Sequence, residues 1–192
     1  MTVMKHKEII RKIEQNPIIA AVRDESLLQK AIESTVSTIF LLHASIFNIN
    51  RMVHAIKDSG KYAMIHIDFL EGIGRDNTAI DYICDVIEPD GIISTKNSNI
   101  KYAADRGMFT IQRFFLIDSM SYDTSVKTAH AIKPHMVEVL PGIMPRIIKR
   151  ISSQLPMPVI AGGLVETKED VLEILNSGAI ATSTGSQELW QL

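Results

Sequence analysis

Two glycine-containing turns near the carboxyl end of the chain have the residue types that bind phosphate. Gly162-Gly163 ends one apolar run, Thr184-Gly185-Ser186 ends the next, and a helical pattern lies between them. Glycine lets backbone N–H groups approach an anion closely, and the start of a helix adds partial positive charge and unpaired donors. For the glycine pair alone, a simple tight turn is the alternative. Two such turns one unit apart favour a phosphate site formed by Gly162, Gly163, Thr184, Gly185 and Ser186.

Five ionisable side chains stand at or close to the ends of other apolar runs: Arg23, Asp68, Lys96, Arg113 and Glu138. A charged residue at the end of a buried strand needs a partner or a ligand. Carboxylates accept hydrogen bonds from ligand hydroxyls, whereas cations offset the charge of an anion. We therefore predict that these five residues bind the remainder of a small phosphorylated ligand. The alternative is that the acids and bases pair with one another, which does not exclude ligand binding.

The histidines do not indicate a metal site. His66 shares a strand face with Asp68 and is expected to be a hydrogen-bonded core histidine, while His43 is consistent with either a structural or a ligand-binding role. Neither HExxH nor CxxC spacing occurs, and the acids and histidines are scattered, so no metal and no catalytic residue is assigned. The loop 69–77 is expected to cover the site.

Eight apolar runs, alternating with helical patterns, must position these residues. The expected strands are 17–22, 38–43, 62–68, 91–96, 109–115, 135–140, 158–161 and 180–184. Apolar strands that alternate with helices are typical of a parallel sheet, and eight units favour closure into a TIM-type (β/α)8 barrel. Because 192 residues are few for that fold, we expect one compact barrel domain, residues 1–192, with short helices and a vestigial last helix. An open doubly wound sheet is the alternative.

A leading helix is expected at 4–15, with Ile9, Ile10 and Ile13 on one face and Pro17 ending it. A vestigial last helix would leave one side of the barrel uncovered, and the leading helix is a candidate to fill that gap. The oligomeric state stays open, because no helix face is more apolar than a barrel requires.

Composition restricts the class of protein. The chain is 46% hydrophobic and 22% charged, with a net charge of -2 and one cysteine. This profile is that of a globular protein, and it excludes an internal disulfide and a general attraction to nucleic acid or anionic membranes. No apolar run approaches the length of a membrane span, and the amino terminus lacks a signal-peptide core. A cytoplasmic protein without a membrane partner is expected.

Seven segments at the expected strand ends resemble the glycerol uptake operon antiterminator family: AAVRD (20–24), HIDFLEGIGRD (66–76), DGIISTK (90–96), QRFFLIDS (112–119), VEVLPGIMP (137–145), PVIAGGLV (158–165) and STGS (183–186). The resemblance covers essentially the whole chain. It implies a regulator of glycerol uptake genes without enzymatic activity. It also implies that glycerol 3-phosphate is the effector, that no cofactor is needed, and that the partner is leader mRNA, on which the protein prevents premature termination.

The densest basic cluster on an exposed helix face consists of Arg146, Lys149 and Arg150, at helical spacing i, i+3, i+4. We call it the 146–150 basic cluster and predict that it contacts RNA phosphates, with Lys127 and Lys133 as the next candidates. Two other functions remain open from the residues alone. One is an aldolase- or isomerase-like barrel enzyme on a small phosphorylated substrate, in which Lys96 serves as a Schiff-base or acid residue and Asp68 or Glu138 as the base. The other is a binding module without RNA or catalysis.

Overall fold

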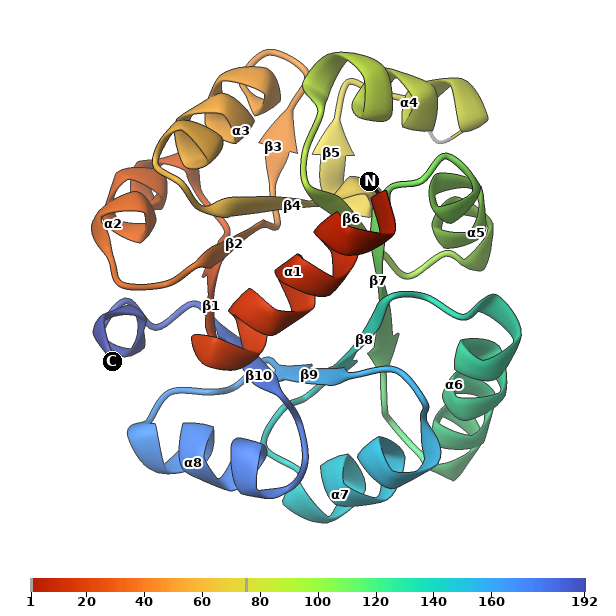
Figure 1. Cartoon of the computed structure of the whole chain (residues 1–192). Coiled ribbons are helices and arrows are strands. Elements are labelled where there is room, and N and C mark those ends of the chain that lie inside the picture. Colours follow the sequence, from red (N-terminus) through yellow and green to blue (C-terminus); the bar gives the residue numbers. More distant parts are fainter. Residues whose placement is uncertain (1, 75) are drawn as a thin grey trace.

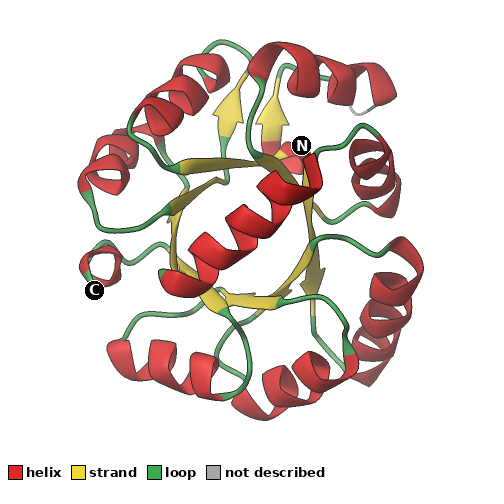
Figure 2. Cartoon of the chain, in the orientation of Figure 1, coloured by secondary structure: helices red, strands yellow, loops and turns green. Residues whose placement is uncertain are grey.

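The computed structural model describes residues 2–74 and 76–192 and contains a closed barrel of parallel strands (Figures 1 and 2). The order around the barrel is β1-β10-β9-β8-β7-β6-β4-β2. The strands are β1 (Ile18–Val22), β2 (Thr38–Leu41), β4 (Tyr62–His66), β6 (Gly91–Ser94), β7 (Phe109–Phe115), β8 (Met136–Leu140), β9 (Val159–Gly162) and β10 (Ala181–Thr184). The predicted (β/α)8 barrel is confirmed, and the open sheet is excluded.

Helices surround the barrel, as Figure 1 shows. They are α2 (Leu28–Glu33), α3 (Ile49–Asp58), α4 (Asn77–Tyr82), α5 (Asn97–Asp105), α6 (Ser119–Ile132), α7 (Pro145–Gln154) and α8 (Lys168–Asn176). A 3-10 turn (Glu25–Leu27) precedes α2, and a π-helical turn (Ile83–Ile87) continues α4. The eighth position holds only the 3-10 turn Leu189–Gln191, so the expected vestigial last helix is present.

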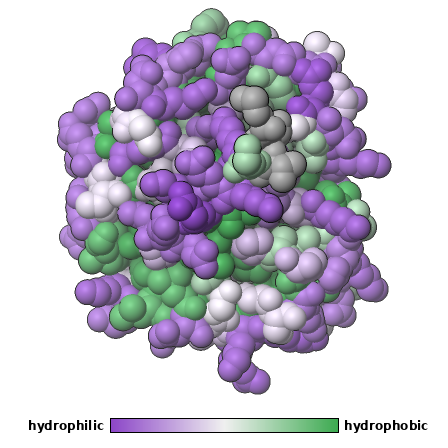
Figure 3. Space-filling model, viewed as in Figure 1, coloured by the Kyte–Doolittle hydropathy of each residue, from purple (hydrophilic) through white to green (hydrophobic). Residues whose placement is uncertain are grey.

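The leading helix, α1 (Thr2–Gln15), lies across the amino-terminal end of the barrel and does not fill the gap beside the last turn (Figure 1). Ile9 and Ile13 are fully buried against the barrel interior, where they join Phe109 in one apolar cluster. The opposite face of α1 is polar, and Figure 3 shows hydrophilic side chains at the centre of this end of the molecule. Burial of its apolar stripe therefore makes α1 a plug.

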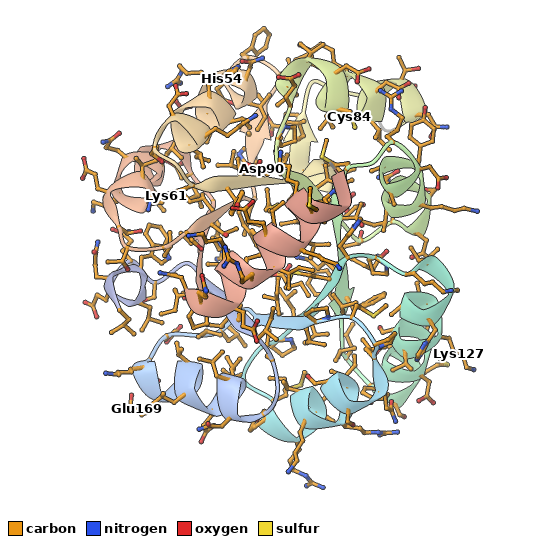
Figure 4. The ribbon with its side chains drawn as sticks, viewed as in Figure 1. His54, Lys61, Cys84, Asp90, Lys127 and Glu169 are labelled. Atoms are coloured by element: carbon orange, nitrogen blue, oxygen red, sulfur yellow. The ribbon has the colours of Figure 1, made fainter. Side chains whose placement is uncertain are left out.

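Contacts between ionisable groups hold this plug at its amino-terminal half. Lys5 Nζ lies 3.1 Å from Asp90 Oδ1, and Asp90 stands at the barrel edge under α1 (Figure 4). The ring of His6 contacts the ring of His135 edge to face, with centroids 4.3 Å apart. The two ends of the barrel are therefore different: α1 covers the amino-terminal end, and the carboxyl-terminal end carries the loops.

Alternation along the strands separates two cores. Alternate residues such as Phe40, Met64 and Ile111 point into the barrel and pack with α1, whereas their neighbours pack against the surrounding helices. Further along the strands, the inward positions become polar: His66, Arg113, Glu138 and Ser183. This polar layer lies between the apolar plug and the carboxyl ends of the strands, where barrels of this kind bind their ligands.

Candidate functional site

A cavity of about 790 Å³ opens at the carboxyl-terminal end of the barrel, on the side away from α1. The ends of β1, β2, β7, β8, β9 and β10 and the loops after them line it, together with Phe69 from the loop after β4. The lining includes the following residues of the site: Arg23, His43, Phe69, Arg113, Gly163, Leu164, Glu166, Thr184, Gly185 and Ser186.

The turn after β9 lines this cavity and contains backbone N–H groups that lack an acceptor among the described residues. Gly163 has φ 80° and Leu164 has φ 62°, so two successive residues adopt the left-handed conformation. This conformation costs a non-glycine residue roughly 1–2 kcal/mol, and such strain concentrates at functional sites. Among the described residues, no acceptor is found for the N–H groups of Gly163, Leu164 or Gly185. The strained Leu164 was not recognised from the sequence, because backbone torsions are set by the surrounding fold.

In the second turn of the predicted phosphate site, Thr184, Gly185 and Ser186 differ in their hydrogen bonds. The Ser186 N–H donates to Thr184 Oγ1 at 3.0 Å, and the Thr184 hydroxyl donates to Val165 O at 2.7 Å. Thr184 therefore joins the two turns, whereas Gly185 lines the cavity and its N–H has no acceptor among the described residues. The indole Nε1 of the buried Trp190 donates to Thr184 O at 2.8 Å. The tail, which sequence reasoning treated as a stub, thus holds this turn in place.

Arg113 and Glu138, two of the five predicted ligand-binding residues, meet inside the barrel. Arg113 Nε donates to Glu138 Oε2 at 2.6 Å, and Ser183 Oγ donates to Glu138 Oε1 at 2.6 Å. The side chains of Arg113 and Glu138 are 6% and 0% exposed. A Cβ at Gly162 would lie 2.0 Å from Ser183 Oγ and 3.0 Å from Glu138 Oε1, so this glycine makes room for the network. Arg113 alone of the pair lines the cavity.

Asp68 and Lys96, two others of the five predicted ligand-binding residues, lie outside the cavity lining. The strands were predicted to continue to these residues, but β4 ends at His66 and β6 ends at Ser94. Asp68 accepts hydrogen bonds from Ser94 Oγ at 2.6 Å and from Thr95 N at 2.7 Å, which connects the two strand ends. Burial opposes ionisation of Asp68, but these hydrogen bonds outweigh it and lower the pKa of its carboxyl group. Lys96 is exposed just before α5.

Arg23 and His43 occupy the rim of the cavity. Both are exposed, and His43 Nε2 lies 3.1 Å from Glu71 Oε1. Glu71 belongs to the short strand β5 (Leu70–Glu71), which pairs with β3 (Ala44–Ser45). This two-stranded sheet was not predicted, because two residues are too few for a periodic pattern. It orders the start of the loop 69–77; Arg75 of that loop lies outside the described residues.

His66 differs from its prediction as a hydrogen-bonded core histidine. It is 1% exposed, yet neither Nδ1 nor Nε2 has a hydrogen-bond partner among residues 2–74 and 76–192. Burial, followed by the nearby Arg113 charge, lowers the pKa of His66 from 6.5 to about 4. The imidazole is therefore neutral at physiological pH and keeps one donor and one acceptor.

The 146–150 basic cluster is on α7, in the outer helix ring, and all three of its residues are exposed. The Arg150 guanidinium stacks 4.3 Å from the centroid of the Tyr122 ring, a cation–π contact that limits its mobility. Lys127, on α6, is at the periphery (Figure 4), and Lys133 follows the end of the same helix. The cluster and both alternatives thus remain accessible to a partner.

Two other kinds of site do not occur in the described part of the chain. Within it, no group of three or more His, Cys, Asp or Glu side chains has the arrangement to hold a metal ion. No helix there is sufficiently long and apolar to cross a membrane. The described residues that line the cavity include no lysine.

Comparison with known proteins identifies the family. Residues 18–190 match the family described as glycerol-3-phosphate responsive antiterminator. YgcP, a protein of Escherichia coli K12 described as uncharacterized, is 41% identical over 184 residues, 96% of each chain.

Solved structures agree with this match. A glycerol uptake operon antiterminator regulatory protein from Listeria monocytogenes is 37% identical, with a TM-score of 0.87 over 91% of this chain and 94% of that one. An antiterminator-related protein from Thermotoga maritima is 33% identical, with a TM-score of 0.82 over 92% of this chain and 99% of that one. A deoxyribose-phosphate aldolase-like protein from Coccidioides immitis, at 11% identity and a TM-score of 0.72 over 100% of this chain and 98% of that one, shares the fold alone. Because the family match spans residues 18–190 and both antiterminator structures superpose along nearly the whole chain, the chain belongs to the glycerol-3-phosphate responsive antiterminator family.

Proposed function

We propose that this protein binds glycerol 3-phosphate in the cavity at the carboxyl-terminal end of its barrel and, with ligand bound, acts on leader mRNA to prevent premature termination in the cytoplasm. The observation that carries the ligand half of the proposal is the pair of adjacent turns with free N–H groups, at Gly163–Leu164 and Gly185. Backbone donors at turns after the seventh and eighth strands are suited to a phosphate dianion. Arg23 and Arg113 add positive charge to the same cavity.

The enzymatic alternative is less well supported by the site. Schiff-base chemistry needs an amine that a bound carbonyl can reach, and Lys96 lies outside the cavity. Glu138, the candidate base, has both oxygens engaged by Arg113 and Ser183. The family is a regulatory one, and the aldolases resemble the chain in fold only.

For the RNA half, we propose that the 146–150 basic cluster meets the phosphates, because the protein as a whole is slightly acidic and must bind RNA through local positive charge. Ligand binding would order the mouth loops, the loop 69–77 above all, and thereby raise the affinity for RNA. Linkage then requires RNA to tighten ligand binding by the same factor.

The test is a gel shift of leader RNA with and without glycerol 3-phosphate, combined with calorimetry of ligand binding. We expect RNA affinity to rise with ligand and to fall when all three residues of the 146–150 basic cluster are replaced by glutamine. A matched control replaces Lys7, Arg11 and Lys12 on α1, which changes the net charge equally on the amino-terminal end of the barrel. If the protein binds ligand but does not shift leader RNA, it is a binding module without an RNA partner. If it turns over a phosphorylated triose, the enzyme hypothesis is supported instead.

A further inference from the structure

The buried His66 has a hydrogen-bonding capacity that the described structure does not use. Its side chain projects from the end of β4 into the barrel and is 1% exposed, with Nδ1 and Nε2 both without a partner among the described residues. Buried polar groups are nearly always hydrogen-bonded, and an exception calls for an explanation. At a buried position that only has to be packed, an apolar side chain would be more favourable than an unpaired imidazole.

The surroundings of His66 connect it to the cavity. The Phe69 ring packs on the imidazole with centroids 4.6 Å apart, and Phe69 is 52% exposed and lines the cavity. Arg113, which also lines the cavity, is near enough for its charge to act on His66. Because Phe69 lines the cavity and His66 does not, the Phe69 ring separates the imidazole from the open space.

The order of the strands places His66 opposite the phosphate turns. In the closed barrel, β4 is three strands away from β10 in one direction and four strands away from β9 in the other. A ligand whose phosphate is held at the turns after β9 and β10 therefore extends its other end across the barrel toward β4. For glycerol 3-phosphate, that other end carries hydroxyl groups, which both donate and accept hydrogen bonds.

From this geometry we infer that His66 binds a hydroxyl of the glycerol end of the ligand, and that Phe69 is a movable cover that the entering ligand displaces. The inference rests on the proposed function and adds the residue that distinguishes glycerol 3-phosphate from inorganic phosphate. The neutral imidazole, with one donor and one acceptor, is complementary to a hydroxyl group. Phe69 lies after the end of β4 and is 52% exposed, so it faces solvent and is not part of a barrel strand.

The test compares the affinities of glycerol 3-phosphate and inorganic phosphate, by calorimetry, for the parent protein and for His66→Leu and His66→Gln. His66→Leu removes both hydrogen-bonding atoms and should weaken glycerol 3-phosphate binding by about tenfold or more, with phosphate affinity nearly unchanged. His66→Gln keeps a donor and an acceptor and should restore part of the loss. An unchanged preference in His66→Leu, or an equal loss for both ligands, would overturn the inference. A parent protein that binds neither ligand would instead refute the proposed function.

Two measurements do not depend on removing His66. In the parent protein, the ring nitrogen resonances of His66 should move when glycerol 3-phosphate is added and stay in place with phosphate. In the Phe69→Trp variant, the fluorescence of the introduced indole should change with the same selectivity, against the background of the buried Trp190. If the His66 resonances do not change when glycerol 3-phosphate is added, the imidazole does not bind the ligand and is hydrogen-bonded to water only. If the emission of the introduced indole does not respond to glycerol 3-phosphate, residue 69 is not a cover that the ligand displaces.

Discussion

Replacing Glu138 with glutamine should destabilise the protein by an amount that its buried network defines. The carboxylate is 0% exposed and accepts 2.6 Å hydrogen bonds from Arg113 Nε and from Ser183 Oγ. Glutamine keeps the shape and one acceptor oxygen, which can still face Arg113. Its NH₂ group can donate to the Ser183 hydroxyl after that hydroxyl rotates. The change therefore removes little except the negative charge that compensates the buried guanidinium.

The magnitude follows from the burial of both partners. Breaking a buried ion pair by removing one partner costs about 3–5 kcal/mol, because the other charge is left uncompensated. Since Glu138→Gln preserves both hydrogen bonds, we expect the lower end, about 3 kcal/mol of unfolding free energy. For a chain of this size, 1 kcal/mol shifts the melting temperature by about 2–4 °C, so the expected drop is about 6–12 °C.

Urea denaturation and thermal melting measure these quantities directly. Glu166→Gln is the matched control, because Glu166 is exposed at the cavity rim and its loss should change stability by less than about 0.5 kcal/mol. Glycerol 3-phosphate affinity should also fall about tenfold or more, since Arg113 loses the partner that orients it. The expected loss of unfolding free energy is about 3 kcal/mol. If the unfolding free energy of Glu138→Gln is within about 1 kcal/mol of the parent value, the buried pair is not electrostatically coupled and the reasoning is refuted.

Four further predictions concern the turns, the RNA surface, pH and the tail. Gly185→Val should abolish glycerol 3-phosphate binding in calorimetry while the melting temperature is retained, because a Cβ there meets only Ala21 O at 3.8 Å; unchanged affinity would place the phosphate elsewhere. Neutralising the 146–150 basic cluster should reduce the slope of log K for leader RNA against log salt by roughly 0.7 per lost phosphate contact, and an unchanged slope would direct attention to Lys127 and Lys133. Stability should decrease as pH falls from 6.5 to about 4, because the folded state depresses the pKa of His66 and the unfolded state binds the proton first. The loss of unfolding free energy amounts to up to ~3 kcal/mol. In urea titrations, the unfolding free energy of His66→Leu should depend less on pH than that of the parent. Trp190→Phe should remove the indole hydrogen bond to Thr184 O and weaken ligand binding more than stability, which calorimetry and melting curves would separate.

Much of the architecture could be predicted from local sequence patterns. Apolar runs alternating with helical faces determine a barrel because each strand is buried on both sides and each helix has one apolar stripe. The short helices and the vestigial last helix followed from chain length. Glycine pairs at two strand ends indicated the phosphate turns, because glycine's conformational freedom is a property of the residue itself.

Only the tertiary structure decided which strand-end residues meet. Arg113 and Glu138 are 25 residues apart in sequence and join because β7 and β8 are neighbours in register. Asp68 and Lys96 were assigned to the cavity, but β4 and β6 end earlier, and the last residues turn away to bind backbone and solvent. The exact residue at which a strand ends depends on hydrogen bonds to its neighbours, which no local pattern contains.

The placement of α1 and the isolation of His66 have the same origin. The sequence of an amphipathic helix predicts its apolar face. The surface on which that face packs depends on which apolar opening the rest of the fold leaves uncovered. Here that opening is the amino-terminal end of the barrel, where Ile9 and Ile13 pack on Phe109. The sequence likewise determined that His66 lies on an inward strand face, whereas the absence of a partner among the described residues is a property of all the surrounding elements together.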